Sequence, residues 1–523
     1  MTTECGIYEY AKHGLELSAD KTALWFYGKS ITYRTLFEKI DNVADNLYAL
    51  GVREGTVVTI HLPNCPQAVM AIYAVAKLGG ICNMVHAQTP AAALRENLIF
   101  TESDFLITYL ADCTDIAKTT LYVDISHHMG IIYRTGYRLK SKSPRPKNIL
   151  SFESIERACP HKAIVPEQKT LAEKCVAYFN SSGTTGKPKT VMHCHKAINN
   201  WVANALEFVR RDSMRDDRRL GVLPMFHGSG VALDMHWIIS GGGALIHMAT
   251  WDANQAVKFI EKLRVTSLTG VPKMYHDLLR NKEFSGKSIR YCYVSGDNVG
   301  ESLKIEFNKR VNQEPCIYEG YGMTETVTAC FSCGEFKENI SASGYPLSHC
   351  EVAVINKNNV VSPIGEGELI VSANTMMMGY FKDEETTHSV FTVTNGKRWF
   401  RTGDYGRIDG DGYIYFIERI KNVIIHNGYN VFPLELEAVT QSLPDVEESC
   451  IVGITDRGSG TQQVRAYIVI APGVDPGLVE KKLKDVWMKK LPRYAIPQQI
   501  RFMSKLPRNS MAKIDRKVLE QIP

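Results

Sequence analysis

The sequence predicts a layered α/β fold, with a large multi-layer N-terminal domain built on parallel-rich sheets and a small α+β domain at the C-terminus. Three observations support this prediction. At 523 residues the chain is too long for one hydrophobic core, so it divides into domains. Short β-branched runs alternate with helical patterns through its first half. Residues 421–523 follow a different order of strands and helices.

The first βα unit is the strand-like run TVVTIHL followed by the helical pattern PQAVMAIYAVAKLGG. Proline is favoured in the first turn of a helix and glycine just beyond its end, so this helix begins at Pro66 and stops at Gly79 and Gly80. Ligands bind at the carboxyl ends of the strands in such sheets. The alternation returns later with a predicted helix over residues 256–263 and strands over residues 265–269 and 289–294.

A different order of strands and helices begins near residue 420. The run GDYGRIDGDGYIYFIER at residues 403–419 predicts a hairpin that closes the large domain. The domains are therefore predicted at residues 1–420 and 421–523, with a hinge at Lys421. Beyond the hinge we expect a helix over residues 433–443, strands over 448–454 and 462–470, and an amphipathic helix over 477–491.

The composition excludes several classes of protein. A net charge of +5 is small for this length, and no stretch gathers enough Lys and Arg to bind nucleic acid, so no nucleic acid partner is expected. The basic stretch at residues 134–147 is interpreted as a solvated loop. Apart from one CxxC pair, Cys330 and Cys333, the 13 cysteines are scattered singly without regular spacing, which predicts neither a zinc site nor a disulfide framework. No secretory signal or long apolar stretch is evident, so a cytoplasmic protein without a membrane span is expected.

A loop rich in glycine and hydroxyl groups has the composition of a polyphosphate-binding loop. It reads FNSSGTTGKPK at residues 179–189 and lies between strand-like runs. Its glycines let backbone amides turn inward, its hydroxyls donate hydrogen bonds, and Lys187 and Lys189 add positive charge. It is not the common GxxxxGK[ST] loop, because Ser181 stands where that motif has its first glycine. Taken alone, such a loop is more often a flexible surface turn.

Further motifs follow this loop in a fixed order, and together they resemble the adenylate-forming superfamily of acyl-CoA synthetases, amino-acid adenylation domains and luciferases. They are YEGYGMTET at residues 318–326, WFRTGDYGR at 399–407, the stretch 419–437 and LPRNSMAKIDRK at 506–517. The ordered set is far more specific than any one motif. The resemblance implies ATP-dependent adenylation of a carboxylic acid with ATP, Mg²⁺ and coenzyme A.

The resemblance implies roles for particular residues at the nucleotide. Tyr321 would stack on adenine, Thr324 would contact the α-phosphate, and Glu325 would hold Mg²⁺ through a hard carboxylate oxygen. Asp404 would accept hydrogen bonds from both ribose hydroxyls, and Arg419 would contact ribose and phosphate. The implied ATP- and AMP-binding residues are Ser181, Ser182, Gly183, Thr184, Thr185, Gly186, Lys187, Gly296, Asp297, Asn298, Glu319, Gly320, Tyr321, Gly322, Met323, Thr324, Asp404, Arg419 and Lys513.

The resemblance also implies a mobile small domain that serves two half-reactions. Lys513 is the implied catalytic lysine, which bridges the attacking carboxylate and the α-phosphate. After adenylation the domain would turn about Lys421 and withdraw this lysine. The residues implied at the pantetheine tunnel are Asn427, Gly428 and Tyr429.

Three positions depart from the family pattern in or near these segments. Ala512 and Glu418 each stand where glycine is usual. Asn422 stands where an acidic residue is usual. If the loop at residue 512 needs positive φ, alanine costs about 1 kcal/mol there.

The segment LPMFHGSG at residues 223–230 resembles the family segment that ends with an aromatic gate to the acyl pocket, here His227. The implied catalytic set is Lys513, Thr324, Glu325 and His227. Amino-acid adenylation domains have an aspartate after the phenylalanine to pair with the substrate ammonium, and Phe226-His227 has none. Residues 231–239 and 327–331, expected to line the pocket, are mostly apolar and without arginine, so a fatty or aromatic monocarboxylate is expected.

His193 and His195 could suggest a metal pair. However, apolar residues recur at helical spacing from His195 to Val209, and no third ligand is evident nearby, so we interpret His195 as the start of a helix.

Two alternatives to an acyl- or aryl-CoA ligase stay open. One is an adenylating enzyme that loads the phosphopantetheine of a carrier protein or releases the adenylate. The other is a non-catalytic nucleotide-binding protein or a luciferase-like oxidative protein. The expected partners are a small carboxylic acid and coenzyme A, and a homodimer is neither required nor ruled out by the sequence.

Overall fold

The structure is a computed structural model that describes residues 2–140, 146, 149–159, 161–181, 189–208, 214–296, 299–311, 317–327, 329–332, 339, 341–348, 350–455, 462–508 and 514–522. The chain divides into two compact units, Met1–Glu351 with Ser372–Thr392, and Val352–Val371 with Val393–Pro523. The second unit thus takes in residues 393–420 as well as the C-terminal segment. The domain boundary and hinge at Lys421 stay predictions.

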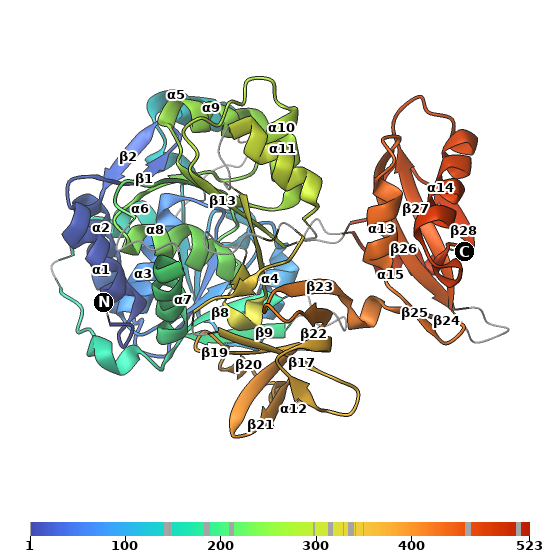
Figure 1. The fold of residues 1–523 in the computed structure, drawn as a ribbon. Helices are drawn as coiled ribbons and strands as arrows, with labels where there is room; N and C mark the ends of the chain where they lie inside the picture. Colours follow the sequence, from blue (N-terminus) through green and yellow to red (C-terminus); the bar gives the residue numbers. More distant parts are fainter. Residues whose placement is uncertain are drawn as a thin grey trace. The chain divides into compact units, whose positions relative to one another are not determined.

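The alternating pattern of the first unit builds two large sheets (Figure 1). One has the strand order β16-β15-β14-β13-β12-β10-β11-β1-β2. Its central strands run parallel, and antiparallel pairs lie at both edges. Its strands are β1 (Thr22–Phe26), β2 (Lys29–Thr32), β10 (Arg218–Gly221), β11 (Ala244–His247), β12 (Ser267–Gly270), β13 (Tyr291–Ser295), β14 (Ile317–Gly322), β15 (Ala329–Ser332) and β16 (Tyr345–Pro346).

The other large sheet has the order β20-β9-β8-β4-β3-β5-β6-β7. Strands β8 to β7 along this path are parallel, whereas β9 pairs antiparallel with both β8 and β20. The β8–β9 hairpin is the strand, loop and strand order predicted around the phosphate loop. The strands are β3 (Val57–His61), β4 (Ile81–Met84), β5 (Phe105–Thr108), β6 (Thr119–Tyr122), β7 (Leu150–Ser151), β8 (Cys175–Ser181), β9 (Lys189–Cys194) and β20 (Gly379–Tyr380).

Helices lie between the sheets and on their outer faces. A shared core joins α1, α2, α3, α7 and α8 to residues of both sheets, so these helices form the layer between them. Helices α9, α10 and α11 cover the other face of the first sheet, and α4 packs on the second. The bounds are α1 (Ile7–Ser18), α2 (Tyr33–Ala49), α3 (Pro66–Lys77), α4 (Ala91–Thr101), α6 (Phe152–Ile155), α7 (His195–Phe208), α8 (Trp237–Ser240), α9 (Ala253–Leu263), α10 (Pro272–Arg280), α11 (Glu301–Val311) and α12 (Glu384–Ser389).

The predicted helix beginning at Pro66 is confirmed as α3, whose proline occupies the first turn. Short helical turns connect the other elements of this unit. They are η1 (Ala111–Cys113), η2 (Ile125–His128), η3 (Gln168–Leu171), the π-helix η4 (Gly230–His236) and η5 (Thr324–Thr326). The layered α/β class predicted from the sequence is confirmed.

One interpretation of the sequence is wrong. The basic stretch at residues 134–147, interpreted as a solvated loop, begins inside helix α5 (Ile131–Lys140). The helix is held by contacts that no local pattern reveals, because Tyr133 packs edge-on against Tyr27 with ring centroids 5.4 Å apart. Of residues 141–147, only residue 146 is described.

The second unit contains a sheet of order β18-β17-β19-β22-β21, with β23 added on β22. The hairpin predicted over residues 403–419 is confirmed as β22–β23, which pairs Asp404 with Arg419. The elements are β17 (Cys350–Ile355), β18 (Val361–Ser362), β19 (Gly365–Ala373), β21 (Phe391–Thr394), β22 (Lys397–Ile408), β23 (Ile414–Arg419) and the turn η6 (Ile420–Asn422).

The C-terminal segment has the predicted mixture of strands and helices around its own core. Leu436, Ile468 and Trp487 are buried there, and they come from three different elements. The elements are β24 (Ile424–His426), β25 (Tyr429–Val431), α13 (Pro433–Gln441), β26 (Val446–Thr455), β27 (Gln462–Ile470), α14 (Pro476–Lys490), η7 (Arg493–Ala495), β28 (Gln499–Phe502) and α15 (Arg516–Gln521). Among the described helices of the chain, none is long and apolar enough to cross a membrane.

Candidate nucleotide and acyl site

The carboxyl ends of β13 and β14 bring two predicted nucleotide segments side by side. Ser295 at the end of β13 is in register with Gly320 on β14. Gly296 follows β13 with φ of +88°, and Tyr321 continues β14 opposite Phe331 of β15. Asp297 and Asn298 lie outside the described residues. The predicted residues Gly296, Gly320, Tyr321 and Gly322 therefore share one edge of the sheet, where ligands bind in parallel α/β folds.

Glu319 shows which part of this segment faces the site. Its carboxylate forms an ion pair with Lys304 of α11, with an N–O distance of 2.7 Å. Burial raises the pKa of the Glu319 carboxyl, and the Lys304 ammonium acts in the opposite direction. The carboxylate thus fastens α11 to β14.

The phosphate loop leaves the second large sheet at the β8–β9 hairpin. Ser181, the last residue of β8, pairs with Lys189, the first of β9. Predicted residues Ser182, Gly183, Thr184, Thr185, Gly186 and Lys187 lie outside the described residues. The Lys189 ammonium lies 4.8 Å from the centroid of the Tyr380 ring. The end of the loop at Lys189 therefore lies beside β20.

The turn η5 carries Thr324 and Glu325 and is held by the second large sheet. His193 on β9 donates from Nε2 to the carbonyl of Thr324 at 2.7 Å. Tyr380 on β20 donates from its hydroxyl to Oε1 of Glu325 at 2.8 Å. Because β9 and β20 are paired strands, the two contacts come from one rigid edge.

Burial determines the protonation of both donors. It lowers the pKa of the His193 imidazole to about 4, so this ring is neutral at pH 7. Burial and the adjacent Glu325 carboxylate raise the pKa of the Tyr380 hydroxyl well above its usual value, so the hydroxyl stays protonated. Glu325 is therefore a carboxylate with one oxygen held by a permanent donor.

The predicted acyl segment lies against the same turn. A Cβ on Gly228 would lie 2.3 Å from the carbonyl oxygen of Val327, so only glycine fits at this approach. Val327 itself has φ of +68°, which is rare for a β-branched residue and is typical of functional sites. In the acyl segment, the ring centroid of Phe226 lies 4.4 Å from the ring centroids of both His86 and His227.

The residues after His227 form the π-helix η4, a geometry found mostly at functional sites. Its fully buried Asp234 accepts hydrogen bonds through Oδ2 from the backbone N–H groups of Val222 (3.1 Å) and Leu223 (2.9 Å). Burial raises the pKa of Asp234 to about 7, although Arg219 and these donors favour the charged form. The carboxylate ties η4 to the strand end that leads into the acyl segment.

Sequence reasoning missed Arg219, which the structure places beside this segment. Its buried guanidinium donates to the Leu233 carbonyl at 2.6 Å and lies 4.2 Å from the ring centroid of Trp237. The segments expected to line the acyl pocket, residues 231–239 and 327–331, contain no arginine, whereas Arg219 comes from β10. No local signal pointed to it, because a β-strand arginine is ordinarily exposed.

In the second unit, the predicted ribose contacts face each other across a hairpin. Asp404 is fully buried, and its Oδ1 lies 2.9 Å from Nε of Arg419. The register of β22 and β23 imposes this pairing, since Asp404 is directly opposite Arg419. The two residues implied at the ribose are thus one preorganised ion pair.

Two departures from the family pattern in the hinge region are joined to each other. The buried Glu418 accepts through Oε1 from the side-chain amide of Asn422 at 3.2 Å and from the backbone N–H of Arg419. Its other oxygen accepts from the N–H of Leu434 at 3.0 Å, in the first turn of α13. An acidic residue at 422 would repel Glu418, so a carboxylate at 418 explains an amide at 422.

Lys421, the predicted hinge, lies in η6 between these two residues. Burial and the neighbouring cations Arg419 and Lys517 lower the pKa of its ammonium to about 8. The predicted tunnel residues lie just beyond, where Asn427 and Gly428 form the two-residue turn between β24 and β25 with positive φ at both positions. Tyr429 stacks on Tyr494 with ring centroids 4.5 Å apart. Lys513 and Ala512 lie outside the described residues.

His193 and His195, the two histidines that could suggest a metal pair, bind different partners. His193 binds the Thr324 carbonyl, and Nδ1 of His195 accepts from the backbone N–H of Ile7 at 3.1 Å, so the two rings have separate partners. His195 begins α7, as predicted. Within the described ranges, the one grouping with ligand-like spacing is His127, His128 and Glu156. There the Lys39 ammonium already binds the Glu156 carboxylate at 2.8 Å, which disfavours a cation.

The chain is similar to known proteins along most of its length. Residues 12–381 match the family model of AMP-binding enzymes, and residues 435–513 match that of the AMP-binding enzyme C-terminal domain. The chain is 29% identical over 512 residues to a 2-succinylbenzoate–CoA ligase of Bacillus thuringiensis subsp. konkukian, covering 97% of this chain and 96% of the relative. A 2-succinylbenzoate–CoA ligase of Bacillus mycoides has the same identity over 512 residues, with the same shares covered.

Solved structures share the fold along nearly the full length. An anthranilate CoA ligase in complex with anthranoyl-AMP superposes with a TM-score of 0.85 at 21% identity, covering 99% of this chain and 97% of the other. The O-succinylbenzoate coenzyme A synthetase of Bacillus subtilis, in complex with ATP and magnesium ion, gives 0.80 at 24% identity, with 98% and 99% covered. The family model spans well over half of the chain, and so this chain belongs to the family of AMP-binding enzymes.

Proposed function

We propose that this protein is an AMP-forming carboxylic acid–CoA ligase, and that its acid carries an aromatic ring. The observation that supports the proposal best is the clamping of η5. His193 on β9, Tyr380 on β20 and Gly228 of the acyl segment all contact the short stretch from Thr324 to Val327. Thr324, Glu325 and the acyl segment, which are predicted to contact the phosphate, the metal and the acid, thus meet at one turn.

In the first half-reaction, a carboxylate oxygen of the acid attacks the α-phosphorus of ATP, and the bond to pyrophosphate breaks. Thr324 would contact the α-phosphate, and Lys189 with the phosphate loop would hold the departing charge. Lys513 would neutralise charge between the attacking carboxylate and the α-phosphate. The product is an acyl-adenylate held beside the Gly228–Val327 contact.

Glu325 suits a magnesium ion. Its carboxylate is a hard oxygen ligand, and the hydrogen bond from Tyr380 fixes one oxygen while the other keeps acceptor capacity. Mg²⁺ usually takes one or two protein carboxylates together with substrate phosphates and water. The bound ion would supply charge neutralisation on the phosphates.

Asp404 and Arg419 would bind the ribose as a unit. The ion pair fixes the Asp404 carboxylate before any ligand arrives, so little ordering is needed for it to accept from ribose hydroxyls. The buried position excludes competing water.

In the second half-reaction, the sulfur of coenzyme A attacks the acyl carbon, AMP leaves, and the thiol proton is lost to solvent or a base. The turn of Asn427 and Gly428 and the Tyr429–Tyr494 stack would contact the pantetheine arm after rotation about Lys421. An AMP-forming ligase needs both arrangements of the small domain at one site.

Two observations support an aromatic acid. Rings of His86, Phe226 and His227 gather at the acyl segment within 4.4 Å of their neighbours, and such rings favour stacking with an aryl group. The relatives at 29% identity are named for 2-succinylbenzoate, which is an aryl acid. A fatty acid would use the apolar surface without the ring contacts.

The test is a panel of carboxylic acids read by pyrophosphate release, with and without coenzyme A. Benzoate-type and succinylbenzoate-type acids are compared with straight-chain acids of matched carbon number. We expect pyrophosphate release with the aryl acids, and AMP together with an acyl-CoA thioester only when coenzyme A is added. His227→Ala should reduce kcat/KM for aryl acids at least tenfold.

Each other outcome contradicts part of the proposal. Preference for the straight-chain acids would refute the aromatic substrate. Adenylate formation without a CoA thioester, but with transfer to a carrier-protein phosphopantetheine, would refute the acceptor. No acid-dependent pyrophosphate release would refute the ligase altogether.

A further inference from the structure

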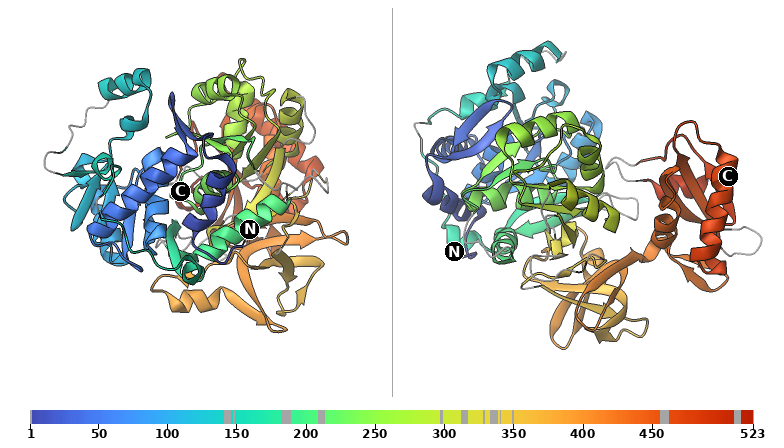
Figure 2. Two further views of the ribbon diagram at one scale, coloured as in Figure 1. Left: turned by 90° about the vertical axis from the view of Figure 1, so that its left-hand side faces the viewer. Right: turned by 45° about the horizontal axis from the view of Figure 1, so that its top comes forward.

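Helix α5 is exposed along its whole length, although it contains three large aliphatic residues. None of its ten residues is buried. The side chains of Ile131, Ile132 and Leu139 are 81%, 83% and 82% exposed. Figure 2 shows this teal helix projecting from the body of the first unit in both views. Three large aliphatic side chains so exposed on one short helix are unusual for a soluble surface.

An ordinary surface helix turns its apolar side chains to the core, and α5 turns them to the solvent. Its two arginines bind the body of the unit: Arg134 donates to the Ser126 carbonyl at 3.0 Å and to the His127 carbonyl, and Arg138, whose side chain stays half exposed, donates to Oδ2 of Asp124 at 3.1 Å. At 100° per residue, Ile132 and Leu139 lie within about 20° of each other, with Lys140 and Arg138 about 90–110° to either side and Arg134 on the far side. Ile131, in the first turn, lies on the Arg138 side of this stripe. The helix is amphipathic, but its apolar face is turned to the solvent.

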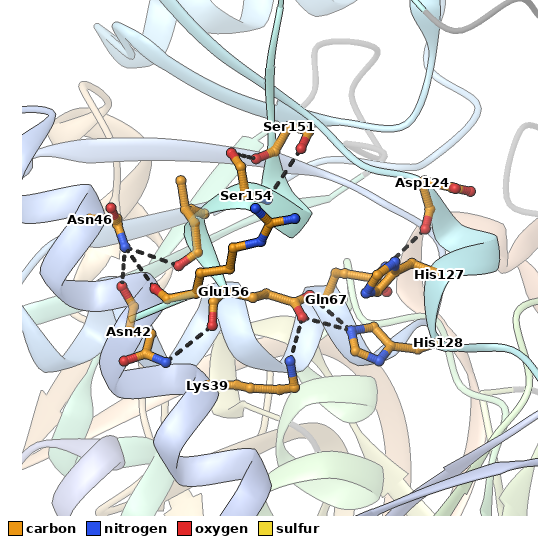
Figure 3. Close-up of polar contacts among 12 residues, drawn as sticks. Lys39, Asn42, Asn46, Gln67, Asp124, His127, His128, Ser151, Ser154 and Glu156 are labelled. Atoms are coloured by element: carbon orange, nitrogen blue, oxygen red, sulfur yellow. Dashed lines mark hydrogen bonds and ion pairs between the residues drawn. The ribbon is translucent and has the colours of Figure 1, made fainter. Parts of the chain in front are cut away.

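The base of α5 is rigid. The arginines are anchored on η2, and Figure 3 shows how η2 is fixed to the rest of the unit. Nε2 of His128 donates to the Glu156 carboxylate at 2.8 Å, and Lys39 of α2 donates to the same carboxylate at 2.8 Å. Tyr133 adds the packing against Tyr27. These contacts fix α5 on η2, and its apolar face therefore stays directed away from the core.

The helix itself is positively charged. The helix contains Arg134, Arg138 and Lys140 and no acidic residue. An occupant of this face must accept both aliphatic side chains and a cationic border.

We propose that α5 is a membrane-docking helix that inserts Ile131, Ile132 and Leu139 into the interface of an anionic phospholipid bilayer. A projecting helix with an apolar stripe and basic flanks has the form of an interfacial anchor, buried about 5–10 Å into the headgroup and acyl boundary. The negative surface of anionic lipid complements Lys140 and the half-exposed Arg138, which flank the apolar stripe. At ten residues the helix is far too short to span a bilayer, so the attachment is peripheral and reversible.

Vesicle co-sedimentation of the full-length protein tests this inference. Vesicles of phosphatidylcholine alone are compared with vesicles containing phosphatidylglycerol, at low and high salt. We expect binding to the anionic vesicles that weakens as salt rises. The double variant Ile132→Ser/Leu139→Ser should reduce partitioning roughly tenfold or more, and Lys140→Glu about fivefold or more.

Matched controls come from other exposed helix positions. Ile305→Ser/Met488→Ser removes two aliphatic side chains that are 54% and 64% exposed on α11 and α14. Lys490→Glu reverses a charge at the end of α14, as Lys140→Glu does at the end of α5. Both controls should bind vesicles like the parent. All variants should keep the parent unfolding temperature, because they touch only exposed side chains.

Three results would overturn the inference. The first is absence of vesicle binding, and the second is equal binding by parent and α5 variants. The third is a concentration-dependent dimer in light scattering that the α5 variants abolish while vesicle binding is absent. That result would assign the helix to self-association.

Discussion

Tyr380 and Glu325 illustrate how a single hydrogen bond prepares a residue for its role. The Tyr380 hydroxyl cannot ionise at ordinary pH, so it always donates to Oε1 of Glu325 and fixes the carboxylate. Sequence motifs pointed to Glu325 but not to Tyr380, which lies 55 residues away. A metal-binding carboxylate commonly depends on such a partner.

From this contact we expect Tyr380→Phe to raise the Mg²⁺ concentration needed for half-maximal pyrophosphate release about tenfold, because the carboxylate loses its orientation. The measurement is a magnesium titration of acid-dependent pyrophosphate release. Tyr48→Phe on α2 is the control and should leave the titration unchanged. An unchanged requirement in Tyr380→Phe would remove Glu325 from the metal site.

Asp234 predicts a pH dependence of stability. Its folded-state pKa of about 7 lies above the value of about 3.9 in an unfolded chain. Between those values the folded protein holds a proton that the unfolded chain has lost, so the free energy of unfolding falls as pH rises from about 4 to about 7.

Asp234→Asn keeps an acceptor oxygen for Val222 and Leu223 but cannot ionise. We therefore expect the variant to lose less stability than the parent between pH 5 and pH 7.5, by on the order of 2 kcal/mol. Denaturant unfolding at both pH values measures the difference. Parallel pH profiles would show that Asp234 does not retain its proton in the folded state.

Among the structural elements, the predicted hinge region shows how two unusual residues compensate each other. Glu418 accepts from Asn422 and from the first turn of α13, so it fastens the end of β23 to the small-domain helix. Each residue by itself departs from the family pattern, but the pair is consistent. Glycine at 418 with an acid at 422 would be a different solution at the same hinge.

We predict strong coupling in a double-mutant cycle at these positions. Asn422→Asp alone should destabilise the protein by about 1–3 kcal/mol, because two carboxylates would face each other. Glu418→Gln/Asn422→Asp should recover about 1 kcal/mol or more of that loss. Thermal or denaturant unfolding of the four proteins gives the coupling energy, and additive effects would contradict the pairing.

Elements with strong local signals were predictable. Pro66 and Gly79 bracket α3, and the Asn427-Gly428 pair produces the turn between β24 and β25. Helix α5 was missed because its stability comes from Arg134 and Arg138 binding the preceding turn η2 and its cap Asp124, and from Tyr133 packing on Tyr27 far away in the sequence. The π-helix η4 has no periodicity of its own to detect, and Asp234 holds it from inside the fold.

Across the chain as a whole, the proposed function requires the C-terminal segment to act in one half-reaction and to withdraw in the other. Lys513→Ala should reduce acid-dependent pyrophosphate release by roughly a hundredfold or more, because the charge on the α-phosphate loses its counter-ion. Thioester formation from supplied acyl-adenylate and coenzyme A should stay within a few-fold of the parent.

Lys505→Ala, at an exposed lysine of the same segment, is the matched control and should affect neither step. Single-turnover assays of the two half-reactions measure the effects separately. Equal loss of both steps in Lys513→Ala would contradict rotation of the small domain between them.

By itself, the sequence determined the class of fold, the order of the motifs and the family to which the chain belongs. These depend on local spacing and on residue types, which the chain carries without folding. Tertiary structure alone decided that His193 and Thr324, 131 residues apart, share a hydrogen bond, and that Gly228 meets Val327. Such contacts form only when the sheets pack together, because the geometry that creates them belongs to the folded layers and not to the local chain.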